Sequence, residues 1–327
     1  MIISVTHRAD YDGIASGALI IRYAYLHLKE PFMVFLKDYS DGPNLIEEPL
    51  IKLKECKLYI ADLSTSFKDL PKVADRIKRM KGCEVYWFDH HPTSEESVNL
   101  LKGAGVNLDL REDRFVAAKI VFQNLYEKMR IEDEVAKRVS DYAVEADNWR
   151  FESEETRDLM DLVSFYNYLD EDSPLTPNLI SFLLHLASLK EAGTLLTELH
   201  RKHIAIYRKM LDRARKLILN TVDLFELNGT KYAIAYSPNL VSGSQAADYL
   251  LSTYDVDIAF VVKEDGTASV RRRGDVDVSK IAKLFGGGGH PYAAGMKLTD
   301  ERISKEEFGK VLEMVKKRLE GLKTLHE

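Results

Sequence analysis

Four short apolar runs in the first hundred residues restrict the fold of this chain more than any other feature. They lie at residues 1–7, 32–40, 57–64 and 83–91. Segments with helical character lie at 13–28 and 67–82, between successive runs. Strands that alternate with crossover helices form parallel sheets with helices on both faces. The first part of the chain is therefore predicted to be an α/β domain with a parallel, doubly wound sheet.

The character of the sequence changes twice further along. A chain of 327 residues exceeds what one hydrophobic core usually holds. From about residue 113 to 220 the pattern is almost wholly helical, and residues 197–220 have the apolar spacing of one long amphipathic helix. Strand, hairpin and helix patterns return after residue 221. We predict a catalytic domain at 1–190, a helical linker at 191–220 and a smaller mixed α/β domain at 221–327, with the active site in the cleft between the domains.

Charge and cysteine content narrow the classes of function. The net charge of −6 argues against binding of nucleic acid through bulk charge, although a local basic groove remains compatible with it. No signal-peptide pattern and no membrane-spanning apolar run occurs, which predicts a cytoplasmic protein. Cys56 and Cys83 cannot form a disulfide framework and lack the spacing of a zinc site, so we predict buried free thiols in a reducing compartment. The scarcity of glutamine beside abundant Lys and Glu favours a thermophile.

Acidic residues and histidines follow three of the predicted strands. The first strand ends in His7, Asp10 and Asp12, the third ends with Asp62, and the fourth ends in Asp89, His90 and His91. Parallel neighbours place these ends at one edge of the sheet, where ligands bind. So many like charges require a compensating cation, and carboxylate with imidazole ligands suits manganese, with zinc possible and calcium unlikely. Turn capping explains any one aspartate, but it explains the repetition at three strand ends poorly.

Five segments occur in a fixed order along nearly the whole chain: "ADYDG", "IADLS", "FDHH", "ADNW" and "GGGGHPYAAG". In this order they resemble the DHH phosphoesterase superfamily with a C-terminal DHHA1 domain. The resemblance implies a pair of manganese ions that support hydrolysis of a phosphate ester or anhydride.

The resemblance also implies a role for each site residue. One ion would be held by His7 and Asp10, and the other by Asp12, His90 and Asp147, with Asp62 bridging both. Asp89 would orient a histidine, and His91 would contact the scissile phosphate. Asp62, Asp89, His90 and His91 are thus the predicted catalytic residues. The separation of His7 from Asp10 varies among relatives and is three residues here.

The C-terminal domain is expected to bind the substrate. Gly286, Gly287, Gly288 and Gly289 would let backbone amides approach an anion, and His290 would add a donor. A flexible turn is the alternative reading of the glycines. In "ASVRRRGD", alignment with the family on Gly274 selects Arg271 as a phosphate-binding residue. Arg272 and Arg273 either contribute to binding or are solvated.

The function implied by the resemblance is a manganese-dependent phosphodiesterase or exonuclease of 3′→5′ polarity. Its substrates would be single-stranded RNA or DNA, short oligonucleotides or nucleotides, as in nanoRNases and archaeal Hef-associated exonucleases. The helical segment and the composition favour the archaeal group, and a DNA-repair protein or a second copy of the chain is a candidate partner. The alternatives are a phosphatase acting on 3′-phosphoadenosine 5′-phosphate and a non-catalytic replication or repair scaffold, which would not need the intact metal set.

The predicted long helix is strongly basic between His200 and Lys216. It holds seven Arg or Lys residues against the single acid Asp212, in a chain that is acidic overall. These charges either keep a linker helix solvated or contact the backbone of a nucleic-acid strand several nucleotides from the scissile bond.

Overall fold

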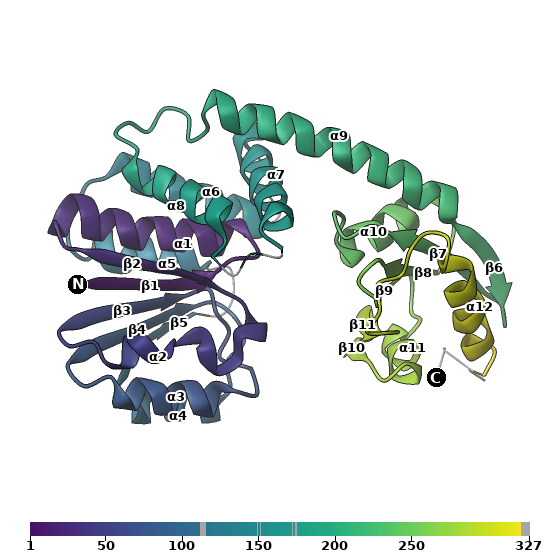
Figure 1. The fold of residues 1–327 in the computed structure, drawn as a ribbon, viewed down its shortest axis with the longest axis horizontal. Helices are drawn as coiled ribbons and strands as arrows, with labels where there is room; N and C mark the ends of the chain where they lie inside the picture. The colour runs from purple at the N-terminus through teal and green to yellow at the C-terminus, as the bar shows by residue number, and fades with distance from the viewer. Residues whose placement is uncertain (112–115, 149, 151, 172, 174, 322–327) are drawn as a thin grey trace. The chain divides into compact units, whose positions relative to one another are not determined.

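The protein is described here by a computed structural model, which covers residues 1–327 except 112–115, 149, 151, 172, 174 and 322–327. It forms two compact units, Met1–Ile204 and Ala205–Glu327. One continuous helix, α9 (Glu198–Thr221), runs from the first unit into the second (Figure 1). The division between the units falls inside the predicted linker. The domain boundaries at residues 190 and 220 stay predictions.

The first unit is built on a five-stranded parallel sheet. Its strands are β1 (Ile2–His7), β2 (Phe32–Lys37), β3 (Cys56–Ala61), β4 (Cys83–Asp89) and β5 (Val106–Leu110). They lie in the order β2-β1-β3-β4-β5, so the predicted parallel α/β sheet is confirmed. The central strand β1 is buried along its whole length, which explains its nearly continuous apolar sequence. The edge strand β5 was not predicted, because it is short and half-exposed.

Helices cover both faces of this sheet (Figure 1). The helices above it in that view are α1 (Tyr11–Arg22), α5 (Ala117–Phe122), α6 (Glu134–Asp147), α7 (Glu154–Leu169) and α8 (Pro177–Ser188). Those below it are α2 (Glu48–Ile51), α3 (Leu70–Arg79) and α4 (Glu95–Gly103). Short π-helical segments lie at Tyr23–Leu28 and Gln123–Glu127, and a 3₁₀-helical segment lies at Tyr39–Leu45. In α3, Leu70, Val73 and Ile77 recur at helical spacing and pack against the sheet in the core that contains Trp87.

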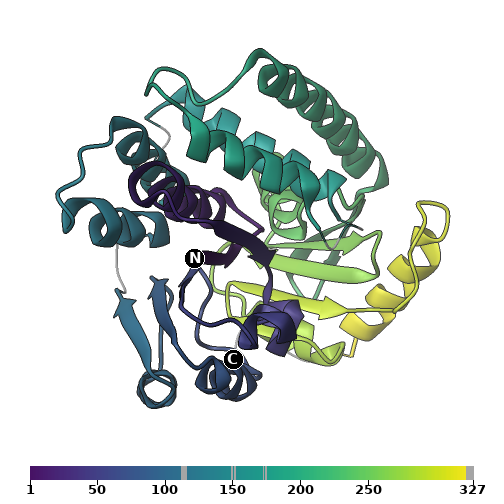
Figure 2. The same cartoon turned by 60° about the vertical axis from the view of Figure 1, so that its left-hand side comes forward.

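The second unit is a mixed sheet of six strands. They are β6 (Asp223–Leu227), β7 (Thr230–Ser237), β8 (Ile258–Lys263), β9 (Thr267–Arg272), β10 (Gly288–His290) and β11 (Ala293–Lys297). Their order is β10-β11-β9-β8-β7-β6, with β7 and β8 parallel and the other neighbouring strands antiparallel. Figure 2 shows this sheet with its helices from a second side. The predicted mixed α/β fold is confirmed.

Two hydrophobic cores form on the two faces of the second sheet. One face packs against α10 (Gly243–Thr253) and the end of α9 through Ile218 and Leu250. The other face packs against α11 (Val278–Leu284) and α12 (Phe308–Leu319), with Phe260 at its centre. Among the helices in the described part of the chain, none has both the length and the apolar character needed to cross a bilayer.

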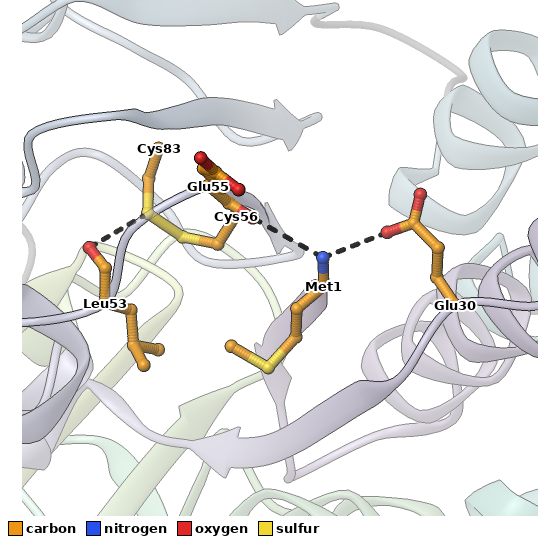
Figure 3. The surroundings of a disulfide bond; sticks show 6 residues. All are labelled: Met1, Glu30, Leu53, Glu55, Cys56 and Cys83. Carbon is orange, nitrogen blue, oxygen red and sulfur yellow. Dashed lines mark hydrogen bonds and ion pairs between the residues drawn. A yellow bond between two sulfur atoms is a disulfide. The ribbon is translucent and has the colours of Figure 1, made fainter.

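The prediction of free cysteine thiols is wrong, because Cys56 and Cys83 form a disulfide (Figure 3). These residues face each other at the start of the neighbouring strands β3 and β4, with their α-carbons 4.5 Å apart, within reach of a disulfide. The amino group of Met1 lies close by and pairs with Glu30 at 3.0 Å. Strand register brings the cysteines together, and their separation in sequence does not reveal it. The argument from free thiols to a reducing compartment therefore no longer holds.

Candidate metal centre

The predicted metal-site residues of the first unit gather at the carboxyl edge of its sheet. His7 ends β1, Asp10 and Asp12 lie at the start of α1, Asp62 follows β3, Asp89 ends β4, His90 and His91 come next, and Asp147 ends α6. Trp149 of the "ADNW" segment lies outside the described residues. In a parallel sheet with the strand order found here, this edge is where ligands bind.

The turn after β1 fixes His7 against Asp10. Asp10 caps α1, because its Oδ1 accepts a hydrogen bond from the backbone N–H of Gly13 at 3.0 Å. Its Oδ2 lies 3.1 Å from Nδ1 of His7. A β-carbon at Gly13 would lie 2.1 Å from the carbonyl oxygen of His7, so only glycine lets the helix begin this close to the strand. The three-residue spacing thus leaves His7 and Asp10 side by side.

Asp62 occupies the middle of the cluster. Its Oδ2 lies 3.6 Å from Nδ1 of His7, and its Oδ1 lies 3.8 Å from Nδ1 of His90. Its backbone has a φ of 57°, in the left-handed region, and its N–H donates to the carbonyl of Phe88 at 3.1 Å. Non-glycine residues in this region cost on the order of 1 kcal/mol and concentrate at functional sites. The surrounding structure therefore holds this carboxylate in place against local backbone preference.

Two groups of potential metal ligands share Asp62. One group is His7, Asp10 and Asp62, and the other is Asp62, Asp89, His90 and His91. Within each group, one ligand atom from every residue lies within 4.8 Å of the others. Since one carboxylate oxygen of Asp62 lies near His7 and the other near His90, this carboxylate could contact two ions.

His90 lies between two further carboxylates. Its Nδ1 is 3.6 Å from Oδ2 of Asp12, and its Nε2 is 3.6 Å from Oδ2 of Asp147. These distances are too long for direct hydrogen bonds. Asp12 also accepts hydrogen bonds at 2.7 and 2.8 Å from the backbone N–H groups of Ala117 and Ala118, which begin α5. Sequence analysis missed this helix-capping role of Asp12, because the residues it caps lie 105 and 106 positions along the chain.

Asp89 orients His91. The Oδ1 of Asp89 lies 2.8 Å from Nδ1 of His91, so the other ring nitrogen is left for a ligand. Asp89 is fully buried, whereas the His91 side chain is 35% exposed. The hydrogen bond that His91 donates to Asp89 raises the pKa of His91, and it outweighs the lowering caused by burial. The arrangement can hold a protonated imidazole at the edge of the cluster.

Repulsion between neighbouring carboxylates and their burial disfavour the charged form of Asp12 and Asp62. Burial and the charge of Asp10 raise the pKa of Asp62 and of Asp12 well above the usual range. Burial also raises the pKa of Asp10, but hydrogen bonding to His7 and the charge of that ring outweigh it and lower the pKa to about 2. Burial lowers the pKa of His90. A divalent cation would remove this repulsion.

Two buried atoms give an independent test of whether a metal fits. Among the residues that the structure describes, Oδ2 of Asp62 and Nδ1 of His90 are buried without a hydrogen-bond partner. A buried polar atom without a partner is costly unless something else contacts it. Carboxylate and imidazole donors together suit a first-row divalent ion. The residues present therefore fit a divalent metal, and the identity of the metal stays a prediction.

In the second unit, Arg271 and His290 lie on the same face of the sheet. Ala293 of β11 is paired with His290 of β10 on one side and with Arg271 of β9 on the other. Residues directly opposite across strands point to the same face, so the two side chains flank Ala293 at a spacing of roughly 10 Å. Arg271 also donates a hydrogen bond of 2.6 Å to Ser244 in α10, a partner that sequence analysis missed.

The four glycines have different structural roles. A β-carbon at Gly287 would lie 2.3 Å from the carbonyl oxygen of Gly295, and one at Gly289 would lie 2.6 Å from that of Ala293. These two glycines allow the close approach of β11. Gly288 faces open space, and Gly286 turns the chain with a φ of 75°. Gly286, Gly288 and Gly289 are exposed, whereas Gly287 is half-buried.

The neighbouring arginines have local partners. Arg272 contacts the carbonyl of Gly274 and lies 3.8 Å from Asp275. Arg273 contacts the carbonyl of Leu251 and lies 3.9 Å from Asp255. Of the three arginines, Arg271 alone shares a face with His290, because alternate residues of a strand point to opposite faces and Arg273 follows the end of β9.

Comparison with known proteins places the second unit in a family. Residues 229–321 match the model of the DHHA1 domain. No curated protein matches the chain.

Solved structures are similar over nearly the whole chain. A structure described as the DHH domain of a member of the s1p family of ribosomal proteins has 16% identity and a TM-score of 0.65, covering 99% of this chain and 87% of that one. The pGpG-specific phosphodiesterase PggH of Vibrio cholerae has 13% identity and a TM-score of 0.55, covering 97% and 98%. CDC45 of Entamoeba histolytica has 9% identity and a TM-score of 0.50, covering 98% and 95%. At these identities the likeness shows a shared fold.

Proposed function

We propose that this chain, a DHH-superfamily protein with a C-terminal DHHA1 domain, is a manganese-dependent phosphodiesterase that hydrolyses single-stranded or short oligonucleotides from the 3′ end. The observation that carries the proposal is the position of Asp62 in both groups of potential metal ligands. A scaffold would have no use for buried carboxylates that repel one another, because they cost stability unless a cation binds.

Each site residue then has a proposed role. His7 and Asp10 would hold one ion, Asp12, His90 and Asp147 the second, and Asp62 would contact both. When bound, two such ions neutralise phosphate charge and provide hydroxide near neutral pH. His91, oriented by Asp89, donates a hydrogen bond to a non-bridging phosphate oxygen, where charge develops during hydrolysis. Asp12 also keeps α5 against the site through its bonds to Ala117 and Ala118.

Two observations support the proposed substrate class: a similar solved structure and two potential phosphate-binding side chains. PggH, which shares the fold, is named for hydrolysis of a dinucleotide. Arg271 and His290 on one sheet face provide two donors for phosphate groups, as an oligonucleotide or a nucleotide bisphosphate would require. A phosphatase acting on 3′-phosphoadenosine 5′-phosphate therefore remains the second candidate function.

Hydrolysis of end-labelled oligomers tests the proposal. Purified protein with manganese is incubated with RNA and DNA of two to about twenty nucleotides, with pGpG and with 3′-phosphoadenosine 5′-phosphate. Successive shortening of a 5′-labelled strand by single nucleotides supports the 3′→5′ polarity. Hydrolysis of the bisphosphate alone would favour the phosphatase. No hydrolysis of any of these with manganese would overturn the proposed function.

Arg271→Ala and His290→Ala are expected to raise KM for a dinucleotide about tenfold or more, while kcat and manganese affinity change little. The reason is that both side chains would bind substrate phosphates equally in the ground and transition states. Steady-state kinetics and isothermal titration with manganese measure the two effects. Arg272→Ala is the matched control, because this side chain is paired with Asp275 and should leave KM unchanged. An equal loss of manganese affinity in the Arg271 or His290 variant would contradict the assignment.

A further inference from the structure

The exposed side of α9 carries a stripe of four basic residues. They are Lys202, Lys209, Arg213 and Lys216, spaced seven, four and three residues apart. With about 3.6 residues per turn, side chains at this spacing lie along one side of the helix and span about 21 Å. The opposite side is buried, with Ala214 and Ile218 in the core of the second unit. The stripe therefore faces away from that core.

Two other cations of the same helix form ion pairs, whereas the four stripe residues form none in the described part of the chain. Arg201 is 3.5 Å from Asp158, and Arg215 is 3.7 Å from Asp212. Within the described residues, none of the four stripe residues has a carboxylate within 4.0 Å. The whole chain has a net charge of −6, so four unneutralised cations on one side of one helix are a local concentration of positive charge.

We propose that this stripe binds the phosphate backbone of a single-stranded nucleic acid, so that the enzyme acts on strands longer than a dinucleotide. The inference rests on the proposed phosphodiesterase function. A linear array of cations over about 21 Å matches a linear array of phosphates, and it is longer than a dinucleotide can contact. Sequence-independent contact is expected, because the stripe offers charge and no base-reading amides or carboxylates.

Charge reversal of two stripe residues tests the inference. Lys209→Glu/Arg213→Glu in the full chain is compared with Lys310→Glu/Lys317→Glu, which makes the same change in net charge at exposed positions of α12. Binding of a fluorescent oligothymidylate of about twenty nucleotides is measured without divalent ions over a range of salt. The stripe variant should bind about tenfold or more weakly, and the log–log salt slope should become shallower by about 1.4, since each lost contact removes ~0.7.

Hydrolysis of a dinucleotide tests the proposed phosphodiesterase function separately from the proposed role of the stripe. The stripe variant should hydrolyse the dinucleotide within twofold of the unmodified chain, because the stripe is proposed to contact longer strands. If the control variant loses as much oligomer binding as the stripe variant, or if neither loses any, the stripe is a solvated face. If the unmodified chain hydrolyses no dinucleotide or oligomer with manganese, the proposed function itself fails.

A second, independent observation concerns Asn167 of α7. Its side-chain amide donates to the carbonyl oxygens of Arg8 and Ala9 at 3.0 and 3.1 Å. These are the two residues between His7 and Asp10. On the other side of the same turn, the backbone N–H of Arg8 donates to the carbonyl of Lys37 at 3.0 Å. The turn is thus held from two directions.

The geometry points to Asn167 as a positioning residue for the pair His7 and Asp10. Asn167 donates two of the hydrogen bonds that hold this turn, and the backbone N–H of Arg8 donates another to Lys37. Ligand orientation depends on such outer contacts, whose loss typically lowers metal affinity by about 10–100-fold. Both hydrogen bonds go to backbone carbonyls, so Asn167 acts on His7 and Asp10 through the backbone of the turn.

Asn167→Leu removes the two donors and keeps the size of the side chain. We expect manganese affinity, measured by titration calorimetry without substrate, to fall about tenfold. Asn167→Gln keeps the amide and should recover part of the loss. Leu169→Ala, at an exposed position of the same helix, should bind manganese as the unmodified chain does.

The melting temperature of the metal-free protein distinguishes positioning from general stability. A positioning role leaves it within a few degrees of the unmodified chain while manganese affinity falls. Manganese affinity unchanged in Asn167→Leu, or a loss of melting temperature without a loss of affinity, would overturn the inference. Absence of manganese binding by the unmodified chain would instead count against the proposed metal centre.

Discussion

Asp62→Asn is expected to lower manganese-dependent hydrolysis by about a thousandfold or more. The substitution keeps the shape of the side chain but removes the charge that both ligand groups share. Metal ions contribute several kcal/mol of charge stabilisation in such reactions, and each 1.36 kcal/mol corresponds to about tenfold in rate. The manganese stoichiometry should fall as well, because Asp62 is proposed to contact both ions. Hydrolysis of a dinucleotide and calorimetric titration measure the two effects.

The stability of the metal-free variant provides the control for misfolding. In the absence of metal, the charge of Asp62 is buried and repelled by Asp10 and Asp12. The melting temperature of metal-free Asp62→Asn should therefore equal or exceed that of the unmodified chain. Asp170→Asn is the matched comparison, since this buried carboxylate caps α8 through Leu179 and should cost stability without affecting kcat. Activity of more than a few per cent with manganese in Asp62→Asn would remove Asp62 from the bridging role.

His91→Ala is expected to lower kcat about a hundredfold while manganese affinity stays within a few-fold of the unmodified value. Loss of one donor to a charge-developing oxygen typically has an effect of this size. His91 belongs to one of the two ligand groups, so the titration is the decisive measurement. A loss of manganese affinity that parallels the loss of kcat would make His91 a metal ligand. His27→Ala, a histidine bonded to Asp133 elsewhere in the first unit, should leave kcat unchanged.

The pH dependence of kcat in Asp89→Asn tests the interaction of Asp89 with His91. Asp89 raises the pKa of His91, so the protonated donor persists to higher pH when Asp89 is present. With that carboxylate neutralised, the pKa of His91 falls, and the donor is lost at a lower pH. The alkaline limb of the kcat profile should therefore move toward acid in Asp89→Asn and should vanish in His91→Ala. A limb at the same pH in all three proteins would remove His91 as its source.

Local sequence patterns predicted the strands β1 to β4 and the residues that follow them, but they missed the edge strand β5. Apolar runs with acidic residues and histidines after them predicted β1, β3 and β4, and the parallel sheet brings His7, Asp62 and Asp89 to one edge, as expected. The roles assigned to these residues stay predictions. The DHHA1 domain was likewise predicted from an ordered set of motifs. These features were predictable because the side-chain pattern of a strand or a helix depends on neighbours in sequence.

Tertiary structure alone decided the contacts between distant residues. The disulfide of Cys56 with Cys83 depends on the register of two strands, and the hydrogen bonds that Asp12 accepts from Ala117 and Ala118 depend on how α5 packs against α1. The hydrogen bond from Asn167 to the turn between His7 and Asp10 spans 159 positions to Arg8. Each of these contacts forms only after helices and strands have packed around a common core, so no local pattern in the sequence records it.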